Sequence, residues 1–545
     1  MGRIRWLATG VLALTQSWVE PALAQNPRSV PLGGRTATMG GAATAAGNDS
    51  AMPYVNPAGL SALPADVFAV SANIYQYQTR TFHGLFAPRG VSAAFGGAHF
   101  FEDERYESTA VSELPTSVMY VRHLPGQSGM AHALAMSLVV PARERNEIRA
   151  SARVALPGAS GFAEQSLSTS SEITDYYMGP SYALALGERL RFGASLYLLY
   201  AQSFRSYEYS SFQSLTGGTI ISKSQLASSS VGTALGVVPI VGAQVAVSDR
   251  LWLGAGVAVP SFHAWGRERT HNVASNASPS ATPSGVVVLE QQALFEGNLQ
   301  DRRPLRANLG IAWEDRGAFS AALDVYYFAE LRGANRFDGR RRVNQFQSGE
   351  IPRRTDERFI EERDLARVVE LAAGVEYAFS PVLAARAGAF SDFSSARAID
   401  EPTTGAFRLR EDRYGGTLGL GTTFGSFDST IGLAYAYGTG KIVTLDLLSD
   451  STNPFAAAET QSHTFMLLFS GAVTIEEAKE TIRRHAPVRV DAPVRDPLAP
   501  DPSPAPPPAK APSAPQEDAA PPAPPPPSVP AEPAPAVEPP PGEPP

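Results

Sequence analysis

Residues 305–313, LRANLGIAW, alternate between apolar side chains and side chains that are polar or small. Because successive side chains of a β-strand point to opposite faces, one face of this segment carries leucine, isoleucine and tryptophan while the other carries Arg306 and Asn308. The length is close to the roughly ten residues with which a tilted strand crosses a bilayer. The stretch therefore predicts a strand with lipid on one side and water on the other.

The same alternation recurs along most of the chain. Clear copies lie at 190–200, 319–327, 369–379 and 463–469, and an aromatic residue often closes the apolar row. Roughly fourteen to sixteen such segments can be drawn between residues 66 and 471, and closure with both ends on one side of a membrane requires an even number. We therefore predict an all-β fold, a transmembrane antiparallel β-barrel over residues 65–471.

The connections between these segments are of two kinds. Short turns at 187–188, 248–250 and 380–381 fit the periplasmic side of an outer membrane. Long polar connections fit the cell exterior, and they lie at 206–230, 267–303, 331–367 and 394–413. A soluble β-sandwich or propeller also alternates, but long strands with small inner residues would pack a poor core. The arginines at 340–342 and 353–354 either meet lipid phosphates or belong to a solvated loop.

Composition narrows the classes of protein further. The chain of 545 residues has no cysteine, which excludes disulfides and thiolate metal sites. Its net charge of −8 gives no basic footprint for nucleic acid. No stretch after residue 24 offers the roughly eighteen apolar residues of a membrane helix, so membrane residence requires a barrel.

Both ends of the chain differ from the barrel. Residues 1–24 combine early arginines, a short apolar run and an Ala-Leu-Ala cleavage site, which is the pattern of a signal peptide. A capping box at 474–477 predicts a short helix within 472–486. Residues 487–545 are rich in proline and alanine and predict a disordered periplasmic tail. The tail either has no specific partner or tethers the barrel to peptidoglycan or a periplasmic protein.

The segment before the first strand carries a recognisable motif. Residues 39–60 read MGGAATAAGNDSAMPYVNPAGL, and Arg35 precedes them. The Met-Gly-Gly-Ala, Asn-Asp and Asn-Pro-Ala-Gly-Leu elements resemble the N-terminal signature of the long-chain fatty-acid outer-membrane transporters, a family that also contains toluene and xylene channels. Similar patterns follow in the family's order at 114–117, 177–183, 254–261 and 306–313. The proline-rich tail is an addition to that pattern.

The resemblance implies a monomeric barrel of about fourteen strands whose N-terminal segment, residues 25–64, folds inside the lumen as a hatch. A plug inside a lumen must be thin and sharply bent, which glycine and alanine permit. It is either a gate or a stopper that never moves. The expected hatch and gating residues are Met39, Gly40, Gly41, Asn48, Asp49, Asn56, Pro57, Ala58 and Gly59.

A fatty acid would need an apolar sleeve for its chain and a cationic partner for its carboxylate, because burying an unpaired carboxylate is costly. The candidates are four arginines that fall on or near inward positions of predicted strands. They are Arg191, Arg205, Arg306 and Arg386. Each one either binds a ligand or forms a structural ion pair with Asp324, Glu370 or Glu376.

Three functions compete. The resemblance implies passive uptake of hydrophobic compounds such as fatty acids through loop capture, a luminal site gated by the hatch, and sideways exit into the membrane. A general diffusion porin would need an open aqueous lumen, and a structural barrel would need only its tether. The histidines are scattered without a matching serine or aspartate pattern that would indicate a catalytic nucleophile, so we predict no enzyme, no metal site and no cofactor. The predicted partners are hydrophobic molecules and outer-membrane lipids.

Overall fold

The computed structural model describes the barrel and its N-terminal segment. The described residues are 26, 28, 31–63, 65–83, 85, 103–110, 115–125, 129–155, 161–215, 220–279, 286–315, 318–348, 350–400, 408–445 and 455–475. The predicted signal peptide at 1–24 and tail at 487–545 lie outside them. No helix of the described part is long and apolar enough to cross a membrane.

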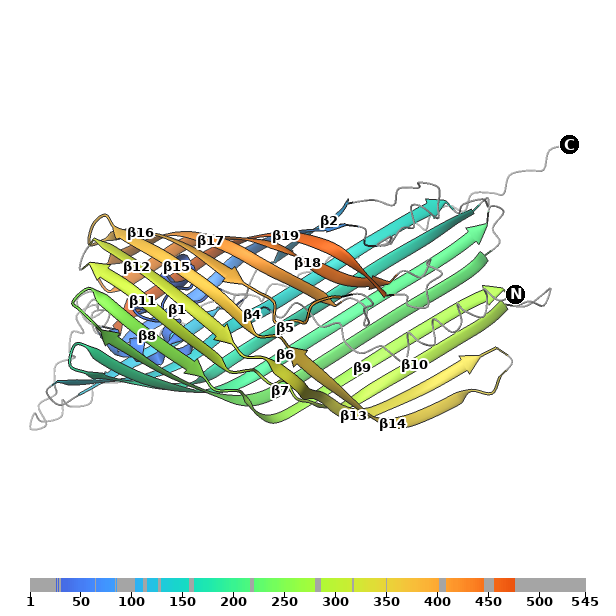
Figure 1. Cartoon of the computed structure of the whole chain (residues 1–545), viewed down its shortest axis with the longest axis horizontal. Coiled ribbons are helices and arrows are strands. Elements are labelled where there is room, and N and C mark those ends of the chain that lie inside the picture. Colours follow the sequence, from blue (N-terminus) through green and yellow to red (C-terminus); the bar gives the residue numbers. More distant parts are fainter. Residues whose placement is uncertain are drawn as a thin grey trace, which may run out of the picture. The chain divides into compact units, whose positions relative to one another are not determined.

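Nineteen β segments of the described chain form one closed antiparallel sheet (Figure 1). They are β1 (Val67–His83), β2 (Asp103–Ala110), β3 (Ser117–Leu124), β4 (Met130–Ala155), β5 (Gly161–Leu186), β6 (Leu190–Leu215), β7 (Ile220–Ala246), β8 (Leu251–Ala258), β9 (Phe262–Pro279), β10 (Val286–Leu299), β11 (Arg306–Asp315), β12 (Phe319–Phe328), β13 (Leu331–Gln347), β14 (Arg353–Leu365), β15 (Val368–Ala378), β16 (Leu383–Asp392), β17 (Leu409–Phe424), β18 (Phe427–Leu445) and β19 (Phe455–Thr474).

The nineteen segments make fourteen wall strands. β2 and β3 both pair with β1, and β8 and β9 both pair with β7, so each couple continues one strand across a break. The same holds for β10 with β11, β12 with β13, and β14 with β15. β19 pairs with β1 and closes the ring. The predicted antiparallel barrel of about fourteen strands is confirmed.

Proline marks several of these irregularities. Pro260 and Pro304 stand in two of the breaks, and Pro141 stands in a register shift between Val139 and Ala142 of β4. Proline has no N–H to donate to the sheet ladder, so each of these three positions lacks one ladder hydrogen bond.

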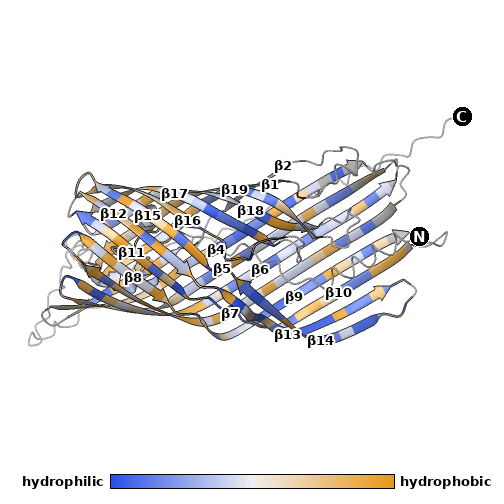
Figure 2. Ribbon diagram, in the orientation of Figure 1, coloured by the Kyte–Doolittle hydropathy of each residue, from blue (hydrophilic) through white to orange (hydrophobic). Residues whose placement is uncertain are grey.

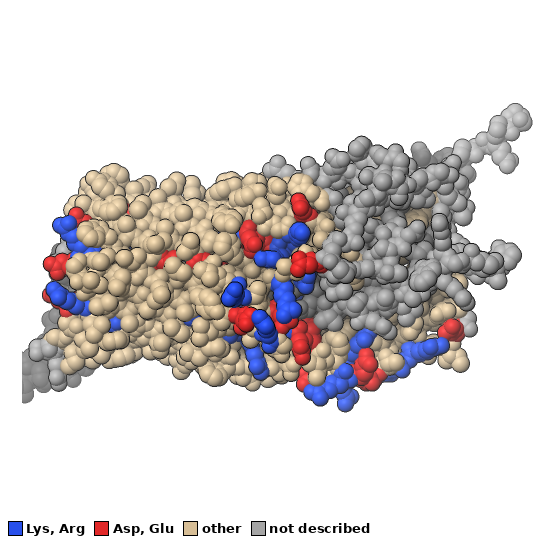
Figure 3. Space-filling model, in the orientation of Figure 1, with Lys and Arg blue, Asp and Glu red and all other residues tan. Residues whose placement is uncertain are grey.

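The side chains alternate across the wall as the sequence predicted. On β11, Arg306 and Asn308 are buried inside the barrel, whereas Leu309 is 65% exposed on its outer face. Leu418 and Leu433 of other strands are similarly exposed, at 65% and 60%. In Figure 2 the hydrophobic residues are concentrated in the half of the barrel that carries the short turns, and on the face drawn in Figure 3 most charged side chains of the described residues lie outside the middle of that half. An outward apolar band of this kind is typical of a barrel that spans the outer membrane.

The predicted long connections are mostly strands, which corrects the expectation of large loops. The described residues within 206–230 form the ends of β6 and β7, those within 267–303 include most of β9 and all of β10, and those within 331–367 include β13 and β14. Their polar side chains pair across strands, for example Ser166 with Ser210 at 2.7 Å. The hydrogen bond from Arg358 on β14 lowers the pKa of Asp338 on β13. Backbone pairing and such side-chain pairs extend the sheet without an apolar pattern.

The other predicted connections and strand ends differ less from the structure. The fourth predicted connection, 394–413, contains an irregular stretch and the first residues of β17. The predicted short turns at 187–188, 248–250 and 380–381 are confirmed. β19 continues to Thr474, beyond the predicted end at 471, because residues 472–474 still pair with β1; the rest of the predicted helix lies outside the described residues beyond Ile475.

Candidate ligand site and hatch

The N-terminal segment lies inside the barrel. It contains two one-turn helices, α2 (Arg35–Thr38) and α3 (Met52–Val55), and the 3₁₀ turn η1 (Pro57–Ala62). Residues 51–60 are all buried. Its hydrogen-bond partners on the wall come from β1, β3, β6, β7, β11, β12, β15, β16 and β17. Contacts with strands around the ring place this hatch in the lumen, as predicted.

Two side chains of the predicted hatch motif hold its internal turns. The Asp49 carboxylate accepts hydrogen bonds from the Thr36 N–H and hydroxyl, both at 2.8 Å, and from the Ala51 N–H at 3.1 Å. Asn56 accepts from the Ala58 N–H at 3.2 Å and so caps η1. Asn48, in contrast, is exposed. Side-chain to backbone hydrogen bonds of Asp49 and Asn56 therefore hold the turns of the hatch.

Met39, Gly40 and Gly41 turn the hatch back after α2. Gly40 and Gly41 have φ of 67° and 89°, a left-handed backbone that other residues adopt at a cost. The Gly40 N–H donates to the Thr417 hydroxyl at 3.0 Å, and that hydroxyl donates to the Thr38 carbonyl at 2.8 Å. Pro57, Ala58 and Gly59 form the buried first residues of η1.

Asp324 of β12 pins the hatch to the wall. One of its carboxylate oxygens accepts hydrogen bonds from the Ala43 N–H at 2.7 Å, the Thr44 N–H at 2.8 Å and the Thr44 hydroxyl at 2.7 Å. Asn308 of β11 adds a bond to the Thr44 hydroxyl at 2.9 Å. Asp324 is fully buried, and its hydrogen bonds make it part of the hatch attachment. Among the described residues it forms no ion pair with a candidate arginine.

Glycines on the wall make room for the hatch. A Cβ on Gly388 of β16 would overlap the backbone of Met39 and Gly40, and one on Gly374 of β15 would overlap Met39. Gly193 and Gly242 leave similar room for Pro57 and Asn56. The small inner residues that would pack a poor soluble core are therefore the surface against which the plug packs.

The substitution Gly388→Val is expected to lower the free energy of unfolding by about 1–3 kcal/mol, because the added side chain enters space occupied by the hatch backbone. Denaturant unfolding of the purified protein measures this. Gly416→Val on β17 is the matched control, since the atom nearest to a Cβ there is the Gly388 carbonyl oxygen at 3.5 Å. Equal losses in the two variants would contradict close packing at Gly388.

A charged cluster joins the hatch to the wall near the short turns. Arg35 pairs with Glu376 of β15 at 3.1 Å and with Glu314 at 3.4 Å, and it donates to the Ala46 carbonyl at 2.8 Å. Arg386 pairs with the same Glu376 and donates to the Thr430 hydroxyl at 2.9 Å. Arg386 therefore has the structural ion pair that the sequence left as its alternative.

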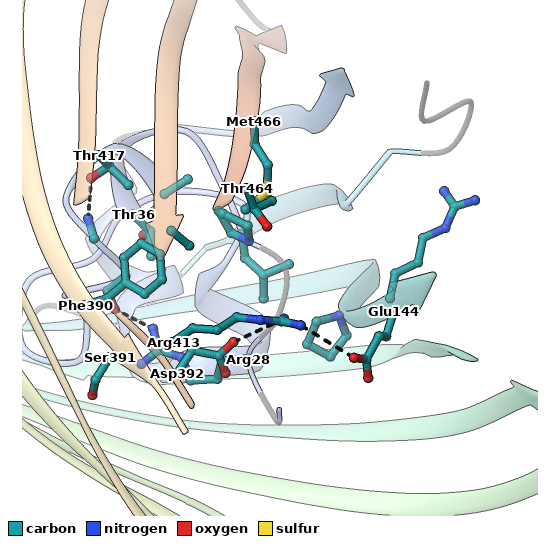
Figure 4. Close-up of a pocket in the computed structure, with 18 of the residues that line it drawn as sticks. Arg28, Thr36, Glu144, Phe390, Ser391, Asp392, Arg413, Thr417, Thr464 and Met466 are labelled. Carbon is teal, nitrogen blue, oxygen red and sulfur yellow. Dashed lines mark hydrogen bonds and ion pairs between the residues drawn. The ribbon is translucent and has the colours of Figure 1, made fainter. Parts of the chain in front are cut away.

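Two cavities lie between the hatch and the wall. The first, here the hatch cavity, has about 1010 Å³ including its opening, and hatch residues such as Arg28 and Leu32 face wall residues such as Glu144 and Asp392. Figure 4 shows Arg413 reaching across it toward Asp392 and Glu144, at 3.8 and 3.5 Å. Arg28 pairs with Glu370 at 3.8 Å. The hatch cavity is thus strongly polar on this side.

The second, here the sleeve cavity, has about 1200 Å³ including its opening. Its apolar lining residues are Ile173, Tyr177, Val238, Leu299, Phe328 and Leu365. Its arginines are mostly neutralised: Arg303 pairs with Asp175 at 2.6 Å and with Asp301 at 2.7 Å, and Arg363 pairs with Asp301 at 2.8 Å. Apolar surface with paired charges at its margin suits the chain of an amphiphilic molecule.

Arg306 differs from the other candidate arginines. It is 4% exposed and lines both cavities, and it makes no ion pair with any residue that the structure describes. Its guanidinium donates to the Tyr54 carbonyl and lies 4.0 Å from the centroid of the Tyr54 ring, while its Nε atom has no partner in the described chain. It is a buried cation that borders both cavities.

The remaining two candidates are Arg205 and Arg191, and neither of them lines both cavities. Arg205 is 8% exposed and lines the sleeve cavity. It belongs to β6 itself and not to a segment beyond the strand, because β6 continues past Tyr200 to Leu215. Arg191 stacks on Trp252 at 4.1 Å and lines neither cavity.

No family model and no curated protein matches the chain. Several solved structures are similar to it. The P. putida toluene transporter TodX is 16% identical with a TM-score of 0.48, over 81% of this chain and 98% of that one. A Pseudomonas aeruginosa FadL homologue is 13% identical with a TM-score of 0.47, over 83% and 100% of the two chains.

The monoaromatic hydrocarbon channel CymD is also similar, at 12% identity and a TM-score of 0.44, over 82% of this chain and 98% of that one. The names of these structures describe transporters and channels, not enzymes. The described residues contain no group of acidic and histidine side chains that could hold a metal ion. The likenesses concern the fold, and the residues of the site carry the functional argument.

Sequence reasoning missed two residues of this site, Arg28 and Tyr54. Both precede the barrel and belong to no alternating pattern, so periodicity gave no signal for them. Asp324 was recognised only as an acid on an inward face, because its hydrogen-bond donors lie about 280 positions earlier in the chain. The one usable signal was the presence of Arg28 in the predicted hatch, since a basic side chain inside the lumen needs an acidic partner on an inward strand face.

Proposed function

We propose that this chain is a passive outer-membrane channel for hydrophobic compounds, with long-chain fatty acids as the leading substrate class. Arg306 carries the proposal, because it is a buried guanidinium without an ion pair among the described residues at the junction of two cavities. Leaving a buried charge unpaired costs on the order of several kcal/mol. A substrate carboxylate would supply the missing partner, and the sleeve cavity would take its chain.

The hatch supports gated passage over general diffusion. A diffusion porin needs an open aqueous lumen, whereas here the lumen holds a segment pinned by Asp324, Asn308 and Thr417. We propose that the hatch residues Met39, Gly40, Gly41, Asp49 and Asn56, with the η1 residues Pro57–Ala62, shift to let substrate pass. Asn48, which is exposed, belongs to the same proposed set.

Sideways exit into the membrane has a candidate position. The hatch cavity is lined by Gln76 and Gln78 of β1 and by Pro141 of β4. Pro141 stands in the register shift of β4, close to the break between β2 and β3, where Val140 donates to the Thr116 carbonyl at 2.8 Å. Irregular pairing supports an exit here, since fewer ladder hydrogen bonds hold the wall.

The proposal includes the wider setting predicted from the sequence. The channel works as a monomer in the outer membrane of a Gram-negative bacterium, with both termini in the periplasm, and it has no catalytic activity and no cofactor. A structural role through the proline-rich tail is the remaining alternative, and it concerns residues 487–545, outside the described part of the chain.

Uptake measurements on Arg306→Gln test the proposal. In a host without its own fatty-acid channel, the variant is expected to take up a labelled long-chain fatty acid about ten- to one-hundredfold more slowly than the parent at low concentration, because a charge-assisted hydrogen bond contributes about 1.5–3 kcal/mol. Uptake of the alcohol with the same chain should be nearly unchanged.

Arg191→Gln is the matched control, because Arg191 lines neither cavity. A small hydrophilic dye tests for porin behaviour in the same cells. Dye entry through the parent protein, or equal loss of acid and alcohol uptake in Arg306→Gln, would contradict the carboxylate role of Arg306.

A further inference from the structure

Tyr54 stands at the boundary between the two cavities. Among the residues that the structure describes, four line both, namely Tyr54, Pro141, Glu144 and Arg306. Pro141 and Glu144 belong to β4 and Arg306 to β11, so all three are wall residues. Tyr54 alone comes from the hatch, where it lies on α3 and is 8% exposed.

The Tyr54 ring is held from two sides. The Arg306 guanidinium lies 4.0 Å from its centroid, and the Tyr177 ring meets it edge-on with centroids 5.2 Å apart and an interplanar angle of 75°. Tyr177 in turn packs edge-on against Tyr197 at 5.8 Å. Cation–π and aromatic contacts of this kind fix a ring more firmly than apolar packing alone.

The ring separates two different environments. On one side the sleeve cavity offers Ile173, Val238 and Phe328 to an acyl chain. On the other side the hatch cavity offers Leu32, Val55 and Met466, although Arg28 and Asp392 also line it. With its carboxylate at Arg306, an acyl chain would enter the sleeve cavity, and the ring would close its way into the hatch cavity.

We propose that Tyr54 is the specificity-determining residue of the channel: its ring is the partition that limits the length of acyl chain accepted with its carboxylate at Arg306. This inference rests on the proposed function and adds the size limit and the residue that sets it. With the ring in place, chain beyond the capacity of the sleeve cavity remains in water. Without the ring, the two cavities become one longer space.

Binding of saturated fatty acids of increasing length tests the partition. The purified full-length protein in detergent is titrated with each acid against a fluorescent fatty-acid probe. Each buried methylene should tighten binding about fourfold until the space is filled, after which the affinity levels off. Tyr54→Phe keeps the ring and should level off at the parental chain length, whereas Tyr54→Ala should keep gaining affinity for longer acids.

A loosened hatch must be distinguished from a missing partition. Asn56→Ala removes the Asn56 hydrogen bonds to the Thr44 and Ala243 carbonyls, at 2.7 and 3.1 Å, and leaves the Tyr54 ring in place. Its affinity should level off at the parental length. The inference is overturned if Tyr54→Ala levels off where the parent does, or if Asn56→Ala shows the same extension to longer acids.

Failure of the inference and failure of the proposed function give different results. A parent protein that displaces no probe with any acid contradicts the fatty-acid proposal itself. A parent that binds acids with a defined length limit, unchanged in Tyr54→Ala, retains the proposal and removes only the role of Tyr54. Thermal unfolding of each variant shows whether the alanine form is folded under the binding conditions.

Discussion

Replacement of Asp324 by alanine is expected to release the hatch from the wall and open the lumen to small hydrophilic solutes. The change removes the carboxylate, one oxygen of which accepts three hydrogen bonds from Ala43 and Thr44. Each hydrogen bond to a charged group contributes about 1.5–3 kcal/mol, and the donors would remain buried without a partner. Single-channel conductance in planar bilayers measures the result, with larger or more frequent openings expected than for the parent.

The control for this substitution is Ser195→Ala. Ser195 donates one hydrogen bond from β6 to the Pro53 carbonyl at 2.7 Å, and its hydroxyl also lies 2.7 Å from that of Ser181 on β5. Only the first of these bonds reaches the hatch, so the loss should cost about 1–2 kcal/mol and leave the lumen closed. Asp324→Asn keeps an acceptor oxygen and should fall between the two. A closed Asp324→Ala channel with a correctly folded barrel would show that the other attachments hold the hatch without Asp324.

The substitution Leu309→Arg is expected to destabilise the membrane-inserted barrel by about 2–4 kcal/mol, the cost of a basic side chain on the lipid face near the bilayer midplane. Leu309 is 65% exposed on β11, within the apolar band. Reversible unfolding in denaturant after refolding into lipid vesicles measures the change in free energy.

Ile360→Arg provides the comparison. Ile360 is 44% exposed on β14, in the charged hairpin with β13, so a further arginine there meets water. Its effect should stay within about 0.5 kcal/mol. Similar losses at positions 309 and 360 would contradict the assignment of the lipid-facing band to the short-turn half of the barrel.

The barrel could be predicted from the sequence because it depends on local properties, whereas the location of its plug was implied by the resemblance of residues 39–60 to a known N-terminal signature. Period-two alternation in segments such as 305–313 is visible among neighbours in the chain, and the small residues at 39–60 permit a thin, bent segment. The long hairpins could not be predicted in the same way. Their serine-rich and charged strands lack apolar contrast, and only pairing such as that of β6 with β7 makes them strands.

The candidate arginines show where sequence reasoning ends. Arg306 and Arg386 both occupy inward positions of predicted strands, and the chain alone gave no reason to prefer either. In the sheet, Arg386 lies directly opposite Glu376 and forms an ion pair with it, whereas Arg306 lies opposite Phe328 and Ala258. The sequence by itself determined a membrane barrel with a plug and a small set of inward cations. Only the tertiary structure decided which cation faces a cavity, because strand register sets each neighbour and register depends on residues far apart in the chain.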